Sequence, residues 1–342
     1  MPGTPAAFED WSANPVTAHS MAAQSSRVTA GPLMVNLAGE GGVGNGGNDS
    51  DAIRRTITKT PSGATFRVPA GEYGMNAETL KMLAKFTLEG DGGDTSWFKL
   101  TEDTNGAALA VEAIGTGVRG SYGARVKGIG INLANAPHAT GVRLGTNDVV
   151  HGAWAALDDV RVEGGAISLD SQAVNARVTN VHFLNPTKSF VKARENGLEL
   201  RIDGAIFELS PAYTVDTVMD IAVTTGGIKG AVYGNFLTLN NQGTITTGCV
   251  LVQCPNGSTA SVPCRFFGCT WDNLSVPAYD FRNVTDCHVI GGWSNAAVGA
   301  GHGAIRFYGG GGHTVALQQQ LNGADCSFDF AGGSPAGIVL LG

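Results

Sequence analysis

The chain has 342 residues, 43% of them apolar, so it is long enough to bury a large core in one or two domains. Glycine contributes 50 residues and charged residues only 15%, a composition that favours many short strands joined by tight turns. The net charge of −7 argues against nucleic acid or an anionic membrane as the partner. No stretch has the apolar length that a membrane span needs.

Residues 1–33 form the first predicted unit, an N-terminal arm rich in Ala, Ser, Pro and Thr. This composition is typical of a tether that joins a chain to a larger assembly. The arm has neither the basic start nor the apolar segment of a secretory signal peptide, so the sequence predicts no such signal.

A glycine-rich stretch follows at 35–57, VNLAGEGGVGNGGNDSDAIRRTI, with the strand, loop and helix outline of a phosphate-binding loop. A P-loop needs Lys and then Ser or Thr after its second glycine, whereas Asn-Gly or Gly-Asn follows here. A dinucleotide site would need a βαβ unit, which is also missing. The glycines are therefore interpreted as turns ahead of a short helix that Asp49 or Ser50 caps and that turns Ile53 and Ile57 to the core.

Seven later segments share one pattern: apolar, variable, turn residue, apolar, variable, large apolar. They begin at Val126, Leu157, Val178, Ile202, Ile228, Phe266 and Val284. The turn position holds only types that tolerate a left-handed backbone: Gly128, Asp159, Asn180, Gly204, Gly230, Gly268 and Asp286. The fourth and sixth positions have the period of two that points both inward from a strand, and the sixth holds Ile131, Val162, Phe183, Phe207, Tyr233, Trp271 and Val289.

The repeat predicts an all-β fold, a parallel β-helix over residues 34–312 with a short N-terminal capping helix, in which each coil holds three short strands. A β-sandwich or barrel is the alternative, and it is disfavoured because two-residue hairpin turns are scarce.

The six cysteines bear on metal binding. Five lie between Cys249 and Cys287 and none forms a CxxC pair, so no metal site is expected. We predict buried free thiols, with disulfides as the alternative. We expect no cofactor.

The segments VNLAGEGGVGNGGNDSDAIRRTI, ATFRVPAGEYGM and FTLEGDGG together resemble the capping region of the pectate-lyase-like right-handed parallel β-helix superfamily. Within it, CRFFGCTWDN and DFRNVTDCHVIGGWSNA are similar to the late coils of bacteriophage tailspikes and tail-fibre polysaccharide depolymerases. The resemblance covers about residues 34–310. It implies a right-handed solenoid in a phage tail, made in the host cytoplasm and acting outside the cell.

The resemblance implies a tailspike-like protein that binds and depolymerises a bacterial surface polysaccharide, as a glycoside hydrolase or a lyase. Two alternatives stay open: a non-catalytic receptor-binding or structural virion spike, and a cellular extracellular lyase or hydrolase of the pectate-lyase-like group. Polygalacturonase-like members carry Asn-Thr-Asp, Asp-Asp, Gly-His-Gly and Arg-x-Lys in that order. This chain has Asp158-Asp159 and Gly301-His302-Gly303 without the first and last motifs, which disfavours that assignment.

Two outward columns of acids follow from the alignment. Adjacent coils lie about 4.8 Å apart, so carboxylates two coils apart are spaced for inverting glycoside hydrolysis. Asp158 and Asp203 stand two coils apart in the second position, and Glu163 and Glu208 do so in the seventh, which makes these four the candidate catalytic residues. The candidate substrate-binding residues are Arg161, His182, Trp154 and Tyr213. A solvated face with weak ion pairs is the alternative.

Residues 313–342 are predicted as C-terminal strands that cap the solenoid or join chains, and they end on an apolar run, Ile338 to Leu341. An uncovered strand edge invites pairing with another chain. The tailspike resemblance implies three parallel chains around one axis, so we expect a homotrimer whose N-terminal arm binds other virion tail proteins. A final coil that caps a monomer is the alternative.

Overall fold

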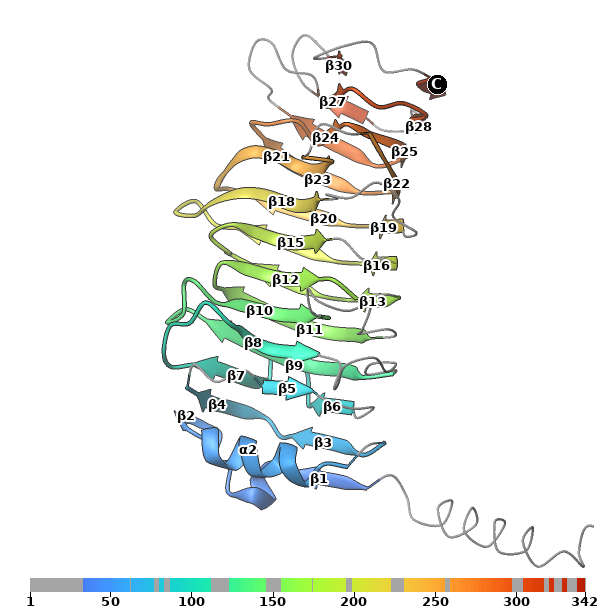
Figure 1. Cartoon of the computed structure of the whole chain (residues 1–342). Coiled ribbons are helices and arrows are strands. Elements are labelled where there is room, and N and C mark those ends of the chain that lie inside the picture. The colour runs from blue at the N-terminus through green and yellow to red at the C-terminus, as the bar shows by residue number, and fades with distance from the viewer. Residues whose placement is uncertain are drawn as a thin grey trace, which may run out of the picture.

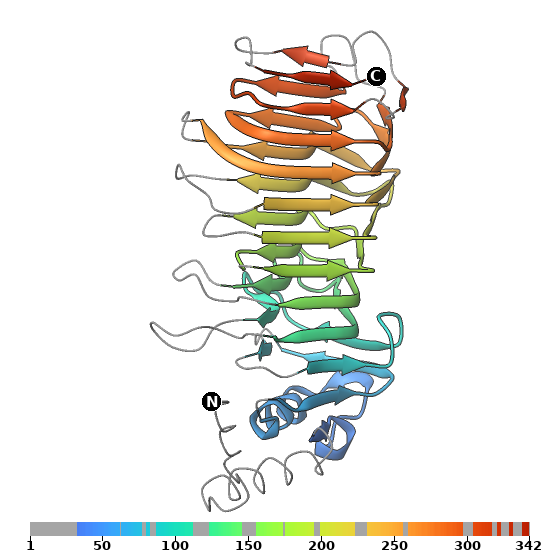
Figure 2. The ribbon, with the colours of Figure 1, turned by 90° about the vertical axis from the view of Figure 1, so that its right-hand side faces the viewer.

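The computed structural model describes residues 33–61, 63–76, 80–82, 87–111, 123–145, 155–173, 175–194, 199–222, 231–255, 259–296, 304–316, 320–322, 328–330 and 337–341. Their strands stack in parallel into an elongated solenoid (Figures 1 and 2). The protein is the predicted all-β right-handed parallel β-helix. The parallel pairing rules out the sandwich and barrel, which are built from antiparallel neighbours.

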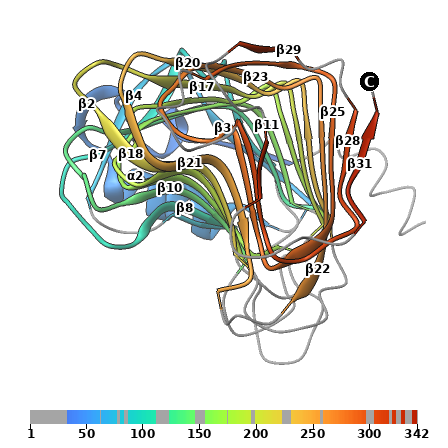
Figure 3. The same ribbon diagram turned by 90° about the horizontal axis from the view of Figure 1, so that it is seen from above.

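Strand pairing defines three faces. The first face contains β1 (Met34–Asn36), β3 (Thr65–Val68), β6 (Thr87–Gly90), β9 (Arg125–Leu133), β11 (Ala156–Gly164), β13 (Ala176–Thr179), β16 (Glu199–Asp203), β19 (Ala231–Asn235), β22 (Ala260–Phe267), β25 (Val284–Ile290), β28 (Thr314–Ala316) and β31 (Val339–Leu341). The second face contains the later halves of β9 and β11 with β2 (Asn45–Asn48), β4 (Gly71–Met75), β7 (Ser96–Leu100), β14 (His182–Leu184), β17 (Ile206–Leu209), β20 (Thr238–Asn241), β23 (Thr270–Leu274), β26 (Trp293–Ala296) and β29 (Gln320–Asn322). The third face contains β5 (Leu80–Met82), β8 (Ala107–Val111), β10 (Thr140–Leu144), β12 (Ile167–Ser171), β15 (Ser189–Arg194), β18 (Thr214–Ala222), β21 (Thr244–Gln253), β24 (Tyr279–Arg282), β27 (Ile305–Tyr308) and β30 (Phe328–Phe330). Figure 3 looks down this stack.

A residue with a left-handed backbone lies at each described bend between the first and second faces from β9 onward. These residues are Gly128, Asp159, Asn180, Gly204, Phe236, Gly268 and Gly291, with φ between 50° and 70°. Five of the seven are the turn residues that the sequence pattern predicts. Gly, Asn and Asp reach this backbone at little cost, which is why the bend leaves a signal in the sequence.

Two predicted copies of the repeat are out of register. The copy at Ile228 places its turn at Gly230, outside the described residues, whereas the bend of that coil is Phe236. The copy at Val284 places its turn at Asp286, whereas β25 runs on to a bend at Gly291. Tyr233 was accordingly assigned to the core wrongly: it is half-exposed and stacks against arginines on the outer surface.

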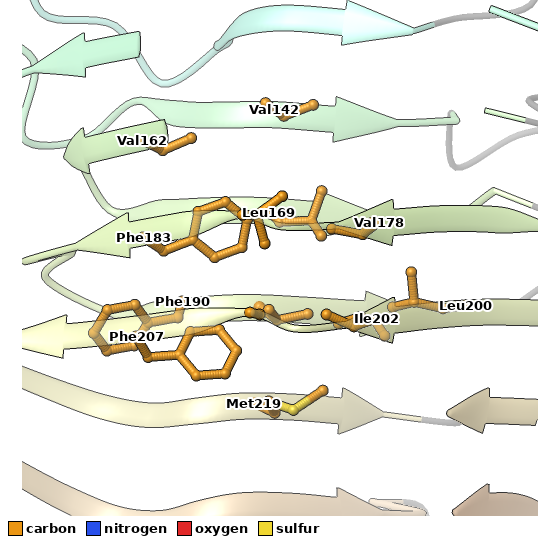
Figure 4. Close-up of a cluster of buried hydrophobic side chains, with 14 of the residues drawn as sticks. Val142, Val162, Leu169, Val178, Phe183, Phe190, Leu200, Ile202, Phe207 and Met219 are labelled. Carbon is orange, nitrogen blue, oxygen red and sulfur yellow. The ribbon is translucent and has the colours of Figure 1, made fainter. Parts of the chain in front are cut away.

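The core consists of the inward columns of all three faces. Phe183 and Phe207 of the second face are fully buried and lie with Phe190 of the third face among aliphatic side chains (Figure 4). Their ring centroids are 6.1 Å (Phe183 to Phe207) and 5.4 Å (Phe190 to Phe207) apart. Burying each such ring stabilises the fold by about 1.5 to 3 kcal/mol, so these columns hold the three faces together.

The helix α2 (Ser50–Lys59) covers the N-terminal end of the solenoid, beside the short 3₁₀ turn η2 (Ala38–Glu40) (Figures 1 and 2). Ile53 is buried and Ile57 packs partly buried on the core, as predicted. The predicted cap is wrong in detail: Asp49 precedes the helix, but its carboxylate accepts the N–H of Val43 (2.8 Å) instead of a helical one. Asp49 therefore fastens the glycine-rich loop.

Strands beyond Gly312 add further rungs, since β28 pairs with β25, and β31 pairs in turn with β28. Among the described strands, none pairs with the outer edge of β29, β30 or β31. Phe330 and Val339 at this end are 51% and 48% exposed. The division of the chain at residue 312 and the arm at 1–33, of which only residue 33 is described, stay predictions.

The cysteines agree with the prediction of free thiols where they are described. Cys249, Cys254, Cys264, Cys269 and Cys287 are buried and unpaired, and the sixth, Cys326, lies outside the described residues. Burial raises the pKa of the Cys249 and Cys287 thiols well above its usual value, so these thiols stay protonated at neutral pH.

Candidate functional site

The second face brings Glu163 and Glu208 into one outward column. Glu163 pairs in register with Leu184, and Leu184 with Glu208, so the two carboxylates stand two rungs apart, or about 9.6 Å along the stack. The neighbouring column runs through Trp97, Gly130, Arg161 and His182, also in register. The alignment of the sequence therefore gives the correct relation among Arg161, His182 and the two glutamates.

Two contacts organise this face. His182 Nε2 lies 3.0 Å from Oε2 of Glu208, and both side chains are partly exposed, so the imidazole can share a proton with the carboxylate. The guanidinium of Arg161 binds the carboxylate of Asp94 and stacks over Trp97, 5.6 Å from the ring centroid. The indole covers Gly130, where any side chain would collide with it. A single glycine therefore gives Trp97 its place beside the polar column.

Asp158 and Asp203 lie on the first face, before the bend. They also stand two rungs apart, with Thr179 between them. Asp158 Oδ1 accepts the hydroxyl of Thr179 (3.0 Å), and Asp203 Oδ1 accepts the amide of Asn235 (2.5 Å). Among the described residues no hydrogen bond or ion pair joins these aspartates to the Glu163 column. The predicted patch is thus two groups on adjoining faces.

The remaining predicted residues have separate outcomes. Tyr213 follows β17 and is 39% exposed, open to a ligand from solvent. Trp154 and the Gly301-His302-Gly303 motif lie outside the described residues. Asp159 of the Asp-Asp motif is a bend residue with φ of 52°. The bend alone accounts for an aspartate at this position, so the motif is not evidence of a catalytic role.

A charged column on the third face was missed by the sequence analysis. Register places in it, rung by rung, Arg143, Asp170, Lys192, Asp220, Leu251, Asp280 and Arg306. Along β15, Lys192 and Arg194 alternate with buried apolar residues, a signal that could have revealed this face. Among the described residues, only some coils have a left-handed residue at a bend next to the third face, such as Gly145, Asn185 and Asn283, so the repeat pattern did not extend to it.

Most acids of this column are held by cations of their own or adjacent rungs. Asp170 is 4% exposed and lies 3.7 Å from Arg143 and 3.6 Å from Arg194, measured to the Nε atoms. Its burial raises the pKa of the carboxyl, while the neighbouring arginines act in the opposite direction. Asp280 is fully buried and binds Arg282 at 2.6 Å. Buried acids of this kind need such counter-charges, so we interpret Asp170 and Asp280 as structural.

Neither a metal-site arrangement nor a membrane-spanning helix is found in the part of the chain that the structure describes. No group of three or more His, Cys, Asp or Glu residues there has the arrangement of a metal site. None of the helices in that part is long and apolar enough to cross a membrane.

No protein-family model matches the chain, and no curated protein matches its sequence. ORF18 of Geobacillus virus E2 is 13% identical with a TM-score of 0.50, over 92% of this chain and 62% of that one. The DFA-IIIase of Arthrobacter chlorophenolicus A6 in complex with GF2 is 12% identical with a TM-score of 0.56, over 91% and 94%. Its C387A mutant in complex with DFA-III is 12% identical with a TM-score of 0.56, over 86% and 86%.

These likenesses concern the fold. They show a right-handed parallel β-helix, which agrees with the fold that the sequence resemblance implies. This chain spans 62% of the length of ORF18, so it corresponds to part of that protein.

Proposed function

We propose that the chain is a phage tailspike-like protein that binds and depolymerises a bacterial surface polysaccharide along its second face. The observation that carries the proposal is the pair of partly exposed carboxylates, Glu163 and Glu208, held two rungs apart in register on a rigid sheet. A structural neighbour from a virus and another solved with GF2 or DFA-III agree with it.

The chemistry follows from the spacing. In inverting hydrolysis one carboxylic acid protonates the leaving oxygen while a carboxylate about 6.5 to 9.5 Å away activates water on the other side of the sugar. Side chains from strands about 9.6 Å apart reach this range by leaning toward each other. His182 contacts Glu208 and is placed to exchange a proton with it, so we assign Glu208 as the acid and Glu163 as the base.

Arg161 lies on the same strand as Glu163, and Tyr213 lies in the connection after β17, the strand that holds Glu208. Both are proposed to bind the sugar chain, together with Trp154. Asp158 and Asp203 are a second pair of acids with the same two-rung spacing, available to glycan that wraps around the bend.

A non-catalytic virion spike with the same fold is the second candidate. The hydrogen bonds that already occupy Asp158 and Asp203 favour it, because acids tied to neighbouring rungs stiffen a binding surface without reacting. A cellular extracellular lyase or hydrolase is the third candidate and shares the architecture.

The proposed assembly is a homotrimer of parallel chains, joined to other tail proteins through residues 1–33. The outer edges of β29, β30 and β31, unpaired within the described strands, and the exposed Phe330 and Val339 support it. Light scattering should give a mass near three times 35.1 kDa. A stable 35.1 kDa monomer at high concentration would refute the trimer.

Replacing Glu208 by glutamine tests the catalytic assignment. Wild-type protein incubated with capsule or lipopolysaccharide from a susceptible host should release oligosaccharides, and Glu208→Gln should release them about a hundredfold more slowly, because the proton donor is lost. The exposed Glu102→Gln is the matched control and should retain the wild-type rate.

The products separate the candidate functions. New reducing ends indicate hydrolysis, and unsaturated uronates indicate a lyase. Binding of the glycan without any product from wild-type protein would favour the non-catalytic spike. A wild-type rate in Glu208→Gln would remove this residue from the mechanism.

A further inference from the structure

The first face carries an outward column in which six of seven residues are basic or aromatic. Register places there, one per rung, Arg125, Ala156, Arg177, Arg201, Tyr233, Arg265 and His288, and we call these seven the arginine column. Rungs are about 4.8 Å apart, so the column is a straight line of about 29 Å. It holds four arginines and no acid on a chain whose net charge is −7.

A hollow of about 520 Å³ opens on this column. Arg125, Arg177 and Arg201 line it together with Ala156 and Glu199. It exists because Ala156 contributes only a methyl group on the rung between the long side chains of Arg125 and Arg177. The hollow thus presents three guanidinium groups and one carboxylate to solvent.

Two of the three arginines at the hollow have no carboxylate partner among the described residues. Arg125 and Arg177 are exposed and make no ion pair within the described residues. Arg177 and Arg201 stand on adjacent rungs, where like charges repel. Of the three, only Arg201 binds an acid, Glu199, at 2.7 Å. An anionic ligand would relieve this repulsion, and the guanidinium fork suits a carboxylate or sulfate.

The far half of the column offers a different surface. Tyr233 lies between Arg201 and Arg265, whose guanidinium carbons are 5.0 and 5.9 Å from its ring centroid. These contacts fix the two arginines in place, so less side-chain entropy is lost on binding. At the end of the column, burial and the neighbouring Arg265 lower the pKa of His288, which adds no further charge at neutral pH.

We propose that the arginine column binds an anionic polysaccharide, with carboxylate or sulfate groups of the glycan in the hollow between Arg125, Arg177 and Arg201. The column is straight and has hydrogen-bonding groups beside it, Thr179, Asp203 and Asn235, which suit sugar hydroxyls. The net charge of −7 disfavours nucleic acid, which carries a phosphate on every nucleotide. The inference rests on the proposed glycan-binding function and adds the charge of the ligand and a second face.

The test uses the full-length chain and titration calorimetry with four probes: polygalacturonate, dextran sulfate, neutral dextran and single-stranded DNA. The wild type should bind one or both anionic glycans and leave dextran unbound. The double variant Arg125→Gln/Arg177→Gln should bind the anionic glycan at least tenfold more weakly. A double variant distant from the column, Arg54→Gln/Lys188→Gln, removes the same charge and should match the wild type. Circular dichroism checks that the variants fold.

The probes also identify the anionic group. Preference for polygalacturonate assigns a carboxylated glycan, and preference for dextran sulfate assigns a sulfated one. Equal affinities in the two double variants, or no binding of either anionic glycan by the wild type, would overturn the proposal. DNA binding that is lost only in the column variant would reassign the column to nucleic acid and overturn it as well.

The outcome is separable from that for cleavage. If the wild type degrades host glycan but binds no anionic probe, only the proposed role of the arginine column is refuted. If the wild type binds through the column but degrades nothing, only the proposed cleavage is refuted.

Discussion

Replacing Trp271 by alanine is expected to lower the free energy of unfolding by about 4 kcal/mol, the usual cost of removing a large buried aromatic side chain. Trp271 is fully buried on the second face. Its ring stacks on Phe207 at 6.4 Å and meets Tyr279 of the third face edge-on at 6.0 Å. The alanine variant would leave a cavity between two faces that the rigid strands cannot close. Urea unfolding followed by circular dichroism measures the change.

Phe267→Ala is the matched control for Trp271→Ala. Phe267 lies four residues earlier, is 46% exposed, and meets the exposed Phe236 at 5.4 Å on the outer surface. Its removal should cost less than about 1 kcal/mol, as for most surface substitutions. Equal losses in the two variants would contradict the assignment of Trp271 to the core.

The repeat was predictable because its signal is local. At Gly128, Asn180 and Gly204 one residue must adopt a positive φ, and the residue types that do so easily are few. Inward residues on either side, such as Val178 and Phe183, add the strand period of two. Together these features identify a solenoid and its coils without knowledge of any pairing.

The register failed where the local signal was absent. Phe236 adopts φ of 51° although aromatic residues seldom do, so no sequence rule points to it as a bend. Its exposed ring packs edge-on against Phe267 of the next rung, a contact between coils that stabilises the bend from outside. In the coil that ends at Gly291, Asp286 has a left-handed backbone but lies inside β25, so the sequence pattern takes it for the bend. The position of the bend in such a coil is determined by pairing with strands distant in the sequence.

The candidate site residues were predictable where the aligned copies are in register and were missed where they are not. Glu163, His182 and Glu208 were placed correctly relative to one another, because the copies that contain them are in register with the structure. The arginine column was missed, since Tyr233 had been assigned to the core and Arg265 then had no aligned neighbour. A column of charged residues on a solenoid can be predicted from the sequence only when every coil between its ends is aligned in the correct register.

His313 makes the C-terminal coils sensitive to acid. Its imidazole is fully buried and stacks on Phe281 at 5.4 Å and Phe307 at 5.0 Å. Nδ1 accepts the backbone N–H of Cys287 at 3.4 Å, and Nε2 has no hydrogen-bond partner among the described residues. Protonation would place a positive charge inside the apolar core, so burial lowers the pKa of His313 to about 4.

Stability should fall between pH 6.5 and pH 4 on this account. In that window the unfolded chain binds a proton at His313 that the folded chain excludes, so the free energy of unfolding decreases as the pH falls. The contribution is intact above pH 6.5, and the loss reaches about 3 kcal/mol near pH 4. His313→Phe keeps the stacking but cannot be protonated, so its stability should fall by less over the same range. Comparing the two proteins removes the effect of other groups, such as Asp170 and His288, which both retain. Parallel curves of unfolding free energy against pH would show that His313 is not the acid-sensitive group.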